Sequence, residues 1–502
     1  MTDIKLVDVS IRDGNQSLWG ATGLNTAQMI SIAPAMARAG FRAIDFNSST
    51  HMGISVRNFR EDPWRCIRLM REAVPDTPLQ FIGTGFRFIS WETAGPDFMR
   101  LVYRRLMVNG ISRFIVLDPM HDVDALLRTA RIIREEGDAK IMAAFTYTLS
   151  EVHDDAFYAS IAARVSASPD VDVCYLKDPS GLLTPERART LIPTIQNAMN
   201  GKPLELHSHC TIGLAPLTYM VAADLGVQCL HTGAGALGSG TSLPSAERTV
   251  ANLREAGHTV HVDDKALREI CDYFDRLADA EGLPKGAPRE YDAAFLRHQI
   301  PGGVMTTLRR QLAEMNLEDR MPRVIEEIER VRAELGYPIM VTPFPQIVCA
   351  QAFSNVIAPE RYEHIPDQVI RYALGRFGRP TAPMDANVKD RILAQPRTKS
   401  ITEEPPALEL DDLRKKHPNV KSDDEFLLRA VMPAAEVDAM LNTEQPDPHY
   451  NPDARPIMKL LKELGTRPPR SELIIDKPGF RLELRKHSRP AGSLESHGRP
   501  GV

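Results

Sequence analysis

The sequence has no C-x-x-C cysteine pair, no run of 18 apolar residues and no Gly-Lys-Ser/Thr phosphate loop. Six cysteines scattered through 502 residues are typical of reduced thiols and not of a disulfide framework. Without a long apolar run or a signal-peptide core we expect no membrane span and a cytoplasmic location. The net charge of −5 comes from interspersed acids and bases, which does not favour nucleic-acid binding.

Short β-rich apolar runs alternate with amphipathic helical patterns through the first 260 residues. Eight of these runs are expected to be strands, over residues 5–9, 43–47, 79–84, 114–118, 140–145, 173–177, 204–209 and 228–232. Asn25 with Gln28 predicts a capping box, and Pro185 is typical of the first turn of a helix. Eight strand–helix repeats favour an α/β fold of the (β/α)8 TIM-barrel type over a doubly wound sheet.

The pattern becomes mainly helical after the barrel. We expect three parts: a barrel over residues 1–300, a helical C-terminal domain over 301–441 that closes the active site, and a tail over 442–502. The tail carries one strand-like stretch within residues 472–485 and an end that its composition predicts to be disordered.

Four residues that could bind a metal fall at the carboxyl ends of expected strands. Asp13 follows the first strand, Lys177 ends the sixth, and His207 and His209 lie at the end of the seventh. In a TIM barrel these strand ends meet at one mouth, where active sites lie. A lysine ammonium repels a metal cation, so Lys177 becomes a ligand only as a neutral amine or as a carbamate formed with CO2. The grouping therefore suggests a metal site with CO2 chemistry.

Each of these features also has an ordinary structural explanation. An isolated H-x-H is often incidental, an R-D-G sequence is a common turn, and Lys177 next to Asp178 could form an ion pair. These explanations become weaker when all three features fall at strand ends of one predicted barrel.

Several motifs occur in one order along the chain: DVSIRDGNQS, YLKDPSGLLTP, LHSHCTIGLAP, GSGTSLPS and IPGGVMTTL. With VTPFPQIV and ALGRFGRPTAPMDANVKDRIL, they resemble the carboxyltransferase component of biotin-dependent carboxylases. That group includes pyruvate carboxylase, the oxaloacetate decarboxylase α subunit and the transcarboxylase central subunit. The resemblance covers roughly residues 5–440.

The resemblance implies a function in which CO2 passes between N1 of carboxybiotin and a small enolisable acceptor. It implies a divalent metal (Zn, Mn or Co) that activates the acceptor as a Lewis acid. Its ligands are Asp13, His207, His209 and N6-carboxylated Lys177, which is also a catalytic residue.

The resemblance also assigns residues outside the metal site. Thr306 corresponds to the threonine that shuttles a proton between biotin and acceptor, although an N-cap role explains it equally well. Arg12 and Gln16 match residues that contact the acceptor, and both could otherwise be ordinary polar turn residues. We expect Tyr147 to be a further substrate-binding residue.

The sequence departs from the family at positions that bind the acceptor. Thr84 stands where enzymes acting on 2-oxoacids have an arginine that pairs with the substrate carboxylate. Arg87 lies three residues on and could substitute, although strand alternation turns it to the other face. A second family arginine is replaced by Ile115. These changes lead to the hypothesis that the acceptor is not pyruvate.

No A-M-K-M biotinylation motif is present, and the nearest match, Met458-Lys459, lies in a helical pattern over residues 456–463. The resemblance therefore implies a separate biotin carboxylase subunit and a separate biotin carboxyl carrier protein as partners, and a homodimer by analogy. The alternative is a biotin-independent metal-dependent lyase or aldolase of the hydroxymethylglutaryl-CoA lyase-like barrel group, which shares R-D-G-x-Q and H-x-H. A scaffold without turnover is a third possibility, against which four intact ligands argue.

Overall fold

Eight parallel strands close a barrel in the computed structural model, because β1 pairs with both β2 and β8. The strands are β1 (Asp3–Asp8), β2 (Ala43–Ser48), β3 (Leu79–Thr84), β4 (Ile111–Leu117), β5 (Lys140–Thr146), β6 (Val173–Asp178), β7 (Leu204–Ser208) and β8 (Cys229–Thr232). A two-residue strand, β9 (Thr259–Val260), adds to the start of β1. The TIM barrel is confirmed, and each expected strand overlaps an observed one.

The structure describes residues 1–90, 92–300, 302–404, 407–452, 472–477 and 480–485, in two units, Met1–Tyr450 and Asn451–Val502. In the second unit, β10 (Glu472–Lys477) pairs antiparallel with β11 (Phe480–Arg485). The single strand expected over 472–485 is therefore a pair, in keeping with the Pro-Gly turn signal at 478–479. The helix expected over 456–463 and the disordered end lie outside the described residues.

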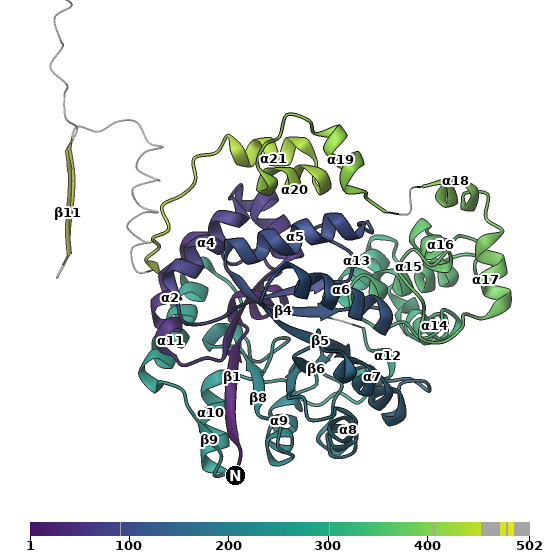
Figure 1. The fold of residues 1–502 in the computed structure, drawn as a ribbon, viewed down its shortest axis with the longest axis horizontal. Helices are drawn as coiled ribbons and strands as arrows, with labels where there is room; N and C mark the ends of the chain where they lie inside the picture. The colour runs from purple at the N-terminus through teal and green to yellow at the C-terminus, as the bar shows by residue number, and fades with distance from the viewer. Residues whose placement is uncertain (91, 301, 405–406, 453–471, 478–479, 486–502) are drawn as a thin grey trace, which may run out of the picture. The chain divides into compact units, whose positions relative to one another are not determined.

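Helices surround the barrel, as Figure 1 shows. The main ones are α2 (Thr26–Arg38), α4 (Pro63–Ala73), α5 (Pro96–Asn109), α6 (Val123–Glu136), α7 (Asp155–Ala167), α8 (Pro185–Ala198), α9 (Ala215–Asp224), α10 (Ala246–Glu255) and α11 (Asp264–Glu281). The predicted capping box is present, since Gln28 N donates to Asn25 Oδ1 and Asn25 N donates to Gln28 Oε1, each at 2.9 Å. Short helical turns complete this part: η1 (Ser10–Gly14), α1 (Asn15–Trp19), α3 (Ser49–Ile54), η2 (Ser55–Phe59), η3 (Gly235–Leu237) and α12 (Phe295–His298).

Strand side chains alternate between the barrel interior and the helix layer. Leu204 and Leu206 of β7 join the apolar core under the helices, whereas Glu205 between them pairs with Arg113 of β4. Part of the interior is apolar: a small cluster on β4 to β6 holds Ile115, Leu117, Met142, Ala144, Val173 and Tyr175. The interior therefore holds both apolar and charged side chains.

A second group of helices has its own apolar core, which includes Ile328, Val348 and Val369. It consists of α13 (Gly302–Glu314), η4 (Glu318–Arg320), α14 (Met321–Glu334), α15 (Phe344–Ile357), α16 (Asp367–Ala373), α17 (Ala386–Leu393) and α18 (Thr398–Glu403). This agrees with the expected helical C-terminal region. The expected domain boundaries at 300/301 and 441/442 remain a proposal.

The last helices of the first unit return to the barrel. The apolar side chains of α19 (Leu410–Lys416), α20 (Asp423–Val431) and α21 (Ala434–Leu441) belong to the barrel core and not to the second core. Figure 1 shows them over α4 and α5, apart from α14–α17. Trp64 Nε1 of α4 donates to Asp424 O at 3.0 Å, and Leu408 N donates to Thr93 O at 2.8 Å. The segment 302–404 thus lies between two parts of the chain that both pack on the barrel.

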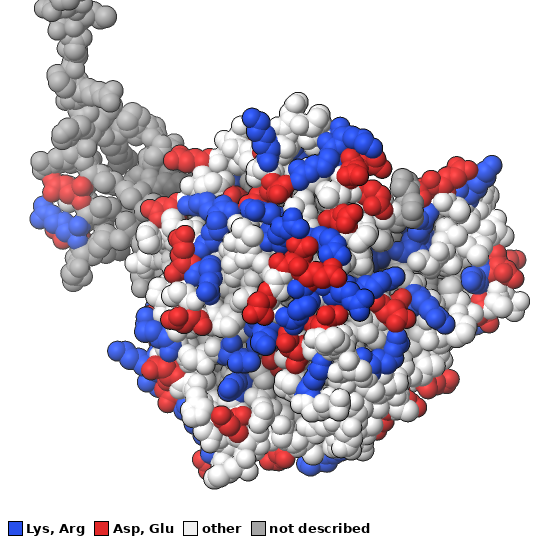
Figure 2. All heavy atoms as spheres, in the orientation of Figure 1, with Lys and Arg blue, Asp and Glu red and all other residues white. Residues whose placement is uncertain are grey.

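The face drawn in Figure 2 carries acidic and basic side chains side by side, without a large area of one sign. Among the described residues, no helix combines the length and the apolar character that crossing a bilayer requires.

Candidate metal centre

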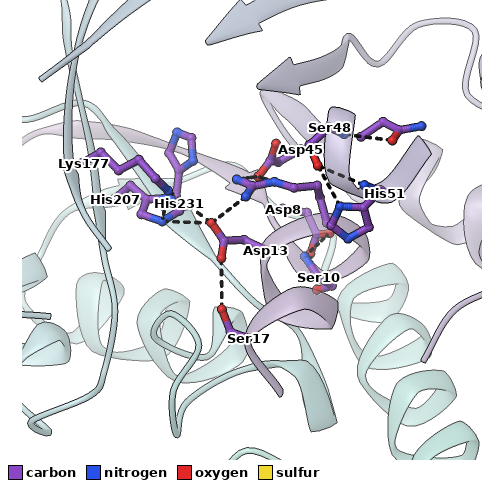
Figure 3. Close-up of polar contacts among 12 residues, drawn as sticks. Asp8, Ser10, Asp13, Ser17, Asp45, Ser48, His51, Lys177, His207 and His231 are labelled. Carbon is purple, nitrogen blue, oxygen red and sulfur yellow. Dashed lines mark hydrogen bonds and ion pairs between the residues drawn. The ribbon is translucent and has the colours of Figure 1, made fainter. Parts of the chain in front are cut away.

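The structure brings the four predicted ligands together at the carboxyl end of the barrel. Asp13 lies in η1 directly after β1, and Lys177 of β6 is in register with His207 of β7. Ligand atoms of Asp13, His207 and His209 all lie within 4.8 Å of one another, and all three residues are buried. Figure 3 shows Lys177, His207 and Asp13 pointing toward one another from three different elements.

Lys177 lies at the centre of this group. Its Nζ is 3.2 Å from Asp13 Oδ2 and 2.9 Å from His207 Nε2. His207 Nε2 is 3.1 Å from His209 Nε2, and His209 Nε2 is 3.4 Å from Asp13 Oδ1. One carboxylate, two imidazole nitrogens and one amine therefore face a common point.

The tautomer of His209 is set by its surroundings. Its Nδ1 lies 2.7 Å from the carbonyl oxygen of Thr241, so Nδ1 carries the proton that it donates. The lone pair of the imidazole is then on Nε2, which faces Asp13. Metal-binding histidines commonly use such a bond to orient the ring. His207 Nδ1 is buried and has no hydrogen-bond partner among the described residues.

Arg12 also binds the Asp13 carboxylate. Its Nη1 is 2.9 Å from Asp13 Oδ2, and its Nε donates to Asp45 Oδ2 at 2.8 Å. Burial by itself would raise the pKa of Asp13, but Arg12, Lys177 and the two histidines outweigh it and hold that pKa well below its usual value. Asp13 is therefore ionised and available to a cation.

Burial lowers the pKa of the Lys177 amine; Asp13 opposes this shift and Arg12 adds to it. Burial also lowers the pKa of His207 well below its usual value, and the neighbouring Lys177 acts in the same direction. Both shifts favour forms that carry a nitrogen lone pair, which are the forms that react with CO2 or bind a metal.

A cavity of about 520 Å³ opens beside this group. Its lining includes Arg12, Gln16 and Thr84, so three of the predicted acceptor-binding residues face one space with Asp13 and Lys177. A second cavity, of about 920 Å³, shares Gln16 and His209 with the first and extends toward α12 and α13. We call them the inner and the outer cavity.

Two predicted site residues line neither of these cavities, and a third lies in a helix. Arg87 lines neither cavity; it donates to the carbonyl oxygen of Arg376 at 3.1 Å. Tyr147 also lines neither cavity, and its ring lies 5.7 Å from that of Tyr158. Thr306 belongs to α13, and its side chain is outside the described residues.

Sequence reasoning missed several charged groups near the predicted metal ligands. Asp45 of β2 holds Arg12, and Arg113 of β4 binds both oxygens of Glu205, at 2.8 and 2.9 Å. His231 Nε2 lies 3.1 Å from Glu205 Oε2. The one available signal is the two-residue spacing of Glu205, His207 and His209, which places all three on one face of β7. Glu205, Cys229 and His231 could also surround a cation, but Arg113 already neutralises the carboxylate.

Comparisons with known proteins agree with the sequence motifs. Residues 295–464 match the family model of the conserved carboxylase domain. The chain is 31% identical over 489 residues to a pyruvate carboxylase subunit of Methanocaldococcus jannaschii, covering 96% of this chain and 84% of that one. It is 30% identical over 461 residues to the 2-oxoglutarate carboxylase large subunit of Hydrogenobacter thermophilus, covering 89% and 70%. The solved carboxyl transferase domain of Rhizobium etli pyruvate carboxylase, with 3-bromopyruvate, gives a TM-score of 0.79 at 24% identity, covering 96% and 83%.

The closed barrel with its following helical region has the fold of a carboxyl transferase domain. The identity and coverage of the curated relatives place the sequence more closely. The chain belongs to the family of carboxyltransferase components of biotin-dependent carboxylases, and it is an enzyme of that class. The resemblance inferred from the motifs is confirmed.

Proposed function

We propose that this protein is a metal-dependent carboxyltransferase that moves CO2 between N1 of carboxybiotin, carried on a separate protein, and a small enolisable acceptor. Family membership supports the reaction class. The observation that carries the proposal for this chain is the convergence of Asp13, Lys177, His207 and His209 on one point beside a cavity.

The donor atoms fit a divalent cation such as Zn, Mn or Co. Two imidazoles and one carboxylate form a mixed N/O set that suits these borderline ions. The hydrogen bond from His209 Nδ1 to Thr241 O fixes the orientation of one ligand in advance. A cation held by these residues would supply a Lewis acid that polarises the acceptor carbonyl.

Lys177 is proposed to be the fourth ligand, as an N6-carboxylysine. Carbamate formation joins the neutral amine to CO2 and releases one proton. Burial of Lys177 favours the neutral amine, and the nearby Arg12 stabilises the negative charge that the carbamate adds. Lys177 is the residue on which the proposal depends most.

The inner cavity is proposed to receive the acceptor and the outer cavity the biotin ring. Gln16 and His209 line both cavities, so molecules in the two would meet at these residues. Arg12 and Gln16 are proposed to orient the acceptor. Thr306 is proposed to transfer a proton: its hydroxyl protonates biotin N1 as CO2 leaves and is reprotonated by the acceptor carbon, which then attacks CO2.

The resemblance assigns the partners. We propose a biotin carboxylase subunit and a biotin carboxyl carrier protein, together with a homodimer of this chain in the cytoplasm. The relative from Methanocaldococcus jannaschii is named as one subunit of pyruvate carboxylase, which supports an assembly of several chains.

The acceptor is proposed to be a compound other than pyruvate. Thr84 lines the inner cavity at the position where the family's 2-oxoacid enzymes have an arginine, and Arg87 lies outside that cavity. Tyr147 and Arg87 remain proposed substrate-binding residues. Because neither lines the inner cavity, they would have to act on the substrate from outside it.

Elemental analysis combined with a carboxybiotin assay tests the function. We expect about one divalent cation per chain. We also expect free carboxybiotin to be consumed when an acceptor is present; this activity should cease after chelation and return when metal is added. Retro-aldol cleavage or acetyl-CoA condensation without biotin, in place of carboxybiotin turnover, would overturn the proposal in favour of the lyase alternative.

A further inference from the structure

The inner cavity has few charged groups in its wall. Among the described residues that line it, the charges belong to Arg12, Asp13 and Lys177, with His209 as a fourth titratable group. Its other lining consists of neutral polar and apolar side chains, such as Ile82 and Leu117. The electrostatic character of the cavity therefore depends on how these few groups are paired.

The arginine that lines the inner cavity is already bound by carboxylates of the protein. Arg12 lies 2.9 Å from Asp13 Oδ2 and bonds Asp45 Oδ2 at 2.8 Å, and Lys177 lies 3.2 Å from the same Asp13 oxygen. Asp13 and Asp45 thus both bind the Arg12 guanidinium. A carboxylate that did not contact the proposed metal would lose its water without gaining an uncommitted arginine among the described lining residues, which opposes its binding there.

Another part of the inner cavity's lining offers hydroxyl groups. Ser49 follows β2 and Thr84 ends β3, and these strands are neighbours in the barrel. Both residues line the inner cavity together with Thr50. Ser49 Oγ is buried and has no hydrogen-bond partner among the described residues. A buried hydroxyl without a partner is unfavourable unless a bound molecule or water satisfies it.

Resting on the proposed carboxyltransferase function, we propose that the acceptor presents an uncharged polar group, not a carboxylate, to the wall formed by Ser49, Thr50 and Thr84. The substrate class is an enolisable acyl compound whose second carbonyl is an amide, ester or thioester. Such a group accepts hydrogen bonds from hydroxyls and needs no counter-ion. Ser49 and Thr84 are then specificity-determining residues for the reaction.

Matched acceptors that differ only in charge test this inference. Loss of free carboxybiotin is measured with the full-length enzyme and pyruvate, pyruvamide or methyl pyruvate. We expect kcat/KM for at least one neutral compound to exceed that for pyruvate by roughly a hundredfold or more. Enzyme sites discriminate strongly against a substrate that leaves buried polar groups unpaired. Equal or better use of pyruvate, or failure to use either neutral compound, overturns the inference.

A substitution in the wall gives a second, independent readout. Thr84→Arg adds a cation beside the inner cavity and should shift the ratio of kcat/KM values toward pyruvate by at least about tenfold. Thr84→Val, which has nearly the same shape, should lower the use of pyruvamide without raising that of pyruvate. If Thr84→Arg does not fold, the wild-type comparison still decides.

The proposed function is judged by separate measurements on the same protein. A ¹³C carbamate signal after exposure to ¹³CO2, together with bound metal, supports the function whichever acceptor is preferred. Preference for pyruvate with an intact carbamate signal would refute the inference and the proposal that the acceptor is not pyruvate, but not the metal-dependent carboxyltransferase reaction. Absence of both metal and carbamate would refute that reaction.

Discussion

Lys177 Nζ and His207 Nε2 lie 2.9 Å apart inside the mouth of the barrel. Two nitrogen atoms at this distance share one proton at most along the line between them, so at least one lone pair faces the other atom. Burial lowers the pKa of both groups, which reduces the positive charge that the pair can carry. The arrangement suits CO2 capture by the lysine followed by metal binding.

Removal of the Lys177 amine should abolish the carbamate. We expect Lys177→Met to lose the ¹³C carbamate signal and to weaken metal binding by at least about a hundredfold, because a proposed direct ligand is removed. Nuclear magnetic resonance with ¹³CO2 and metal titration measure the two effects. Lys140→Met, at a side chain that is 61% exposed, is the control and should change neither. A persistent carbamate signal in Lys177→Met would contradict the assignment.

Asp45 should be important for stability although it is not a predicted ligand. Asp45→Asn removes one of the two carboxylates that hold the buried Arg12 guanidinium, so we expect a loss of about 3 kcal/mol in the free energy of unfolding. Glu269→Gln breaks a half-exposed ion pair with Arg38 and should cost less than about 1 kcal/mol. Urea unfolding of both variants checks this, and equal losses would show that burial does not set the difference.

The ion pair of Arg113 with Glu205 should make the free energy of unfolding decrease at acidic pH. Burial would raise the pKa of Glu205, but Arg113 and His231 outweigh it and lower that pKa to about 2. Because the folded-state pKa lies below the unfolded value, the stabilisation is present above pH 4.5 and is lost as the pH falls toward 2. Glu205→Gln should therefore be destabilised by about 3 kcal/mol at pH 7, with a smaller difference from wild type near pH 3. A difference that does not vary with pH would refute the argument.

His153 should affect the free energy of unfolding over a different pH range. Burial, with His121 and Arg332 nearby, lowers its pKa to about 2, so it stays neutral in the folded protein while the unfolded chain takes up a proton below pH 6.5. Its contribution to stability is thus present above pH 6.5 and is lost as the pH falls, with a slope of up to about 1.4 kcal/mol per pH unit.

The matching experiment compares unfolding free energies between pH 7 and pH 5. His153→Asn keeps an acceptor for Ser150, whose hydroxyl lies 2.6 Å from His153 Nδ1, and should show a shallower decline than wild type. His449→Asn, at a side chain that is 86% exposed, serves as the control and should follow wild type. Identical curves for His153→Asn and wild type would rule out this origin of acid sensitivity.

The barrel and the position of its candidate metal centre could be predicted from sequence for a physical reason. The third strand was expected over residues 79–84 and has these bounds, because short apolar runs between turn signals are local features. Asp13, Lys177 and His207 follow or end strands of one barrel, so their convergence follows from the topology.

Long-range partners could not be predicted in this way. Arg113 and Glu205 are separated by 92 residues, and their contact depends on the stagger of strands across the barrel. The sequence likewise predicts that α20 and α21 have apolar faces, but it does not predict which surface these faces pack against. Trp64 and Asp424, 360 residues apart, meet through such an interaction.

The return of the chain to the barrel after α18 restricts how the helices α13–α18 can move. They are joined to the barrel at residue 300 and again at Leu408, whose backbone bonds Thr93 O and Gly95 N at 2.8 and 2.9 Å. A swing about the axis through these two anchor points preserves both attachments. Displacement straight away from the barrel would break the backbone pairing at Leu408, and also the bonds of Arg332 to Leu149 O and Thr148 Oγ1, so such a motion carries a cost in several hydrogen bonds at once.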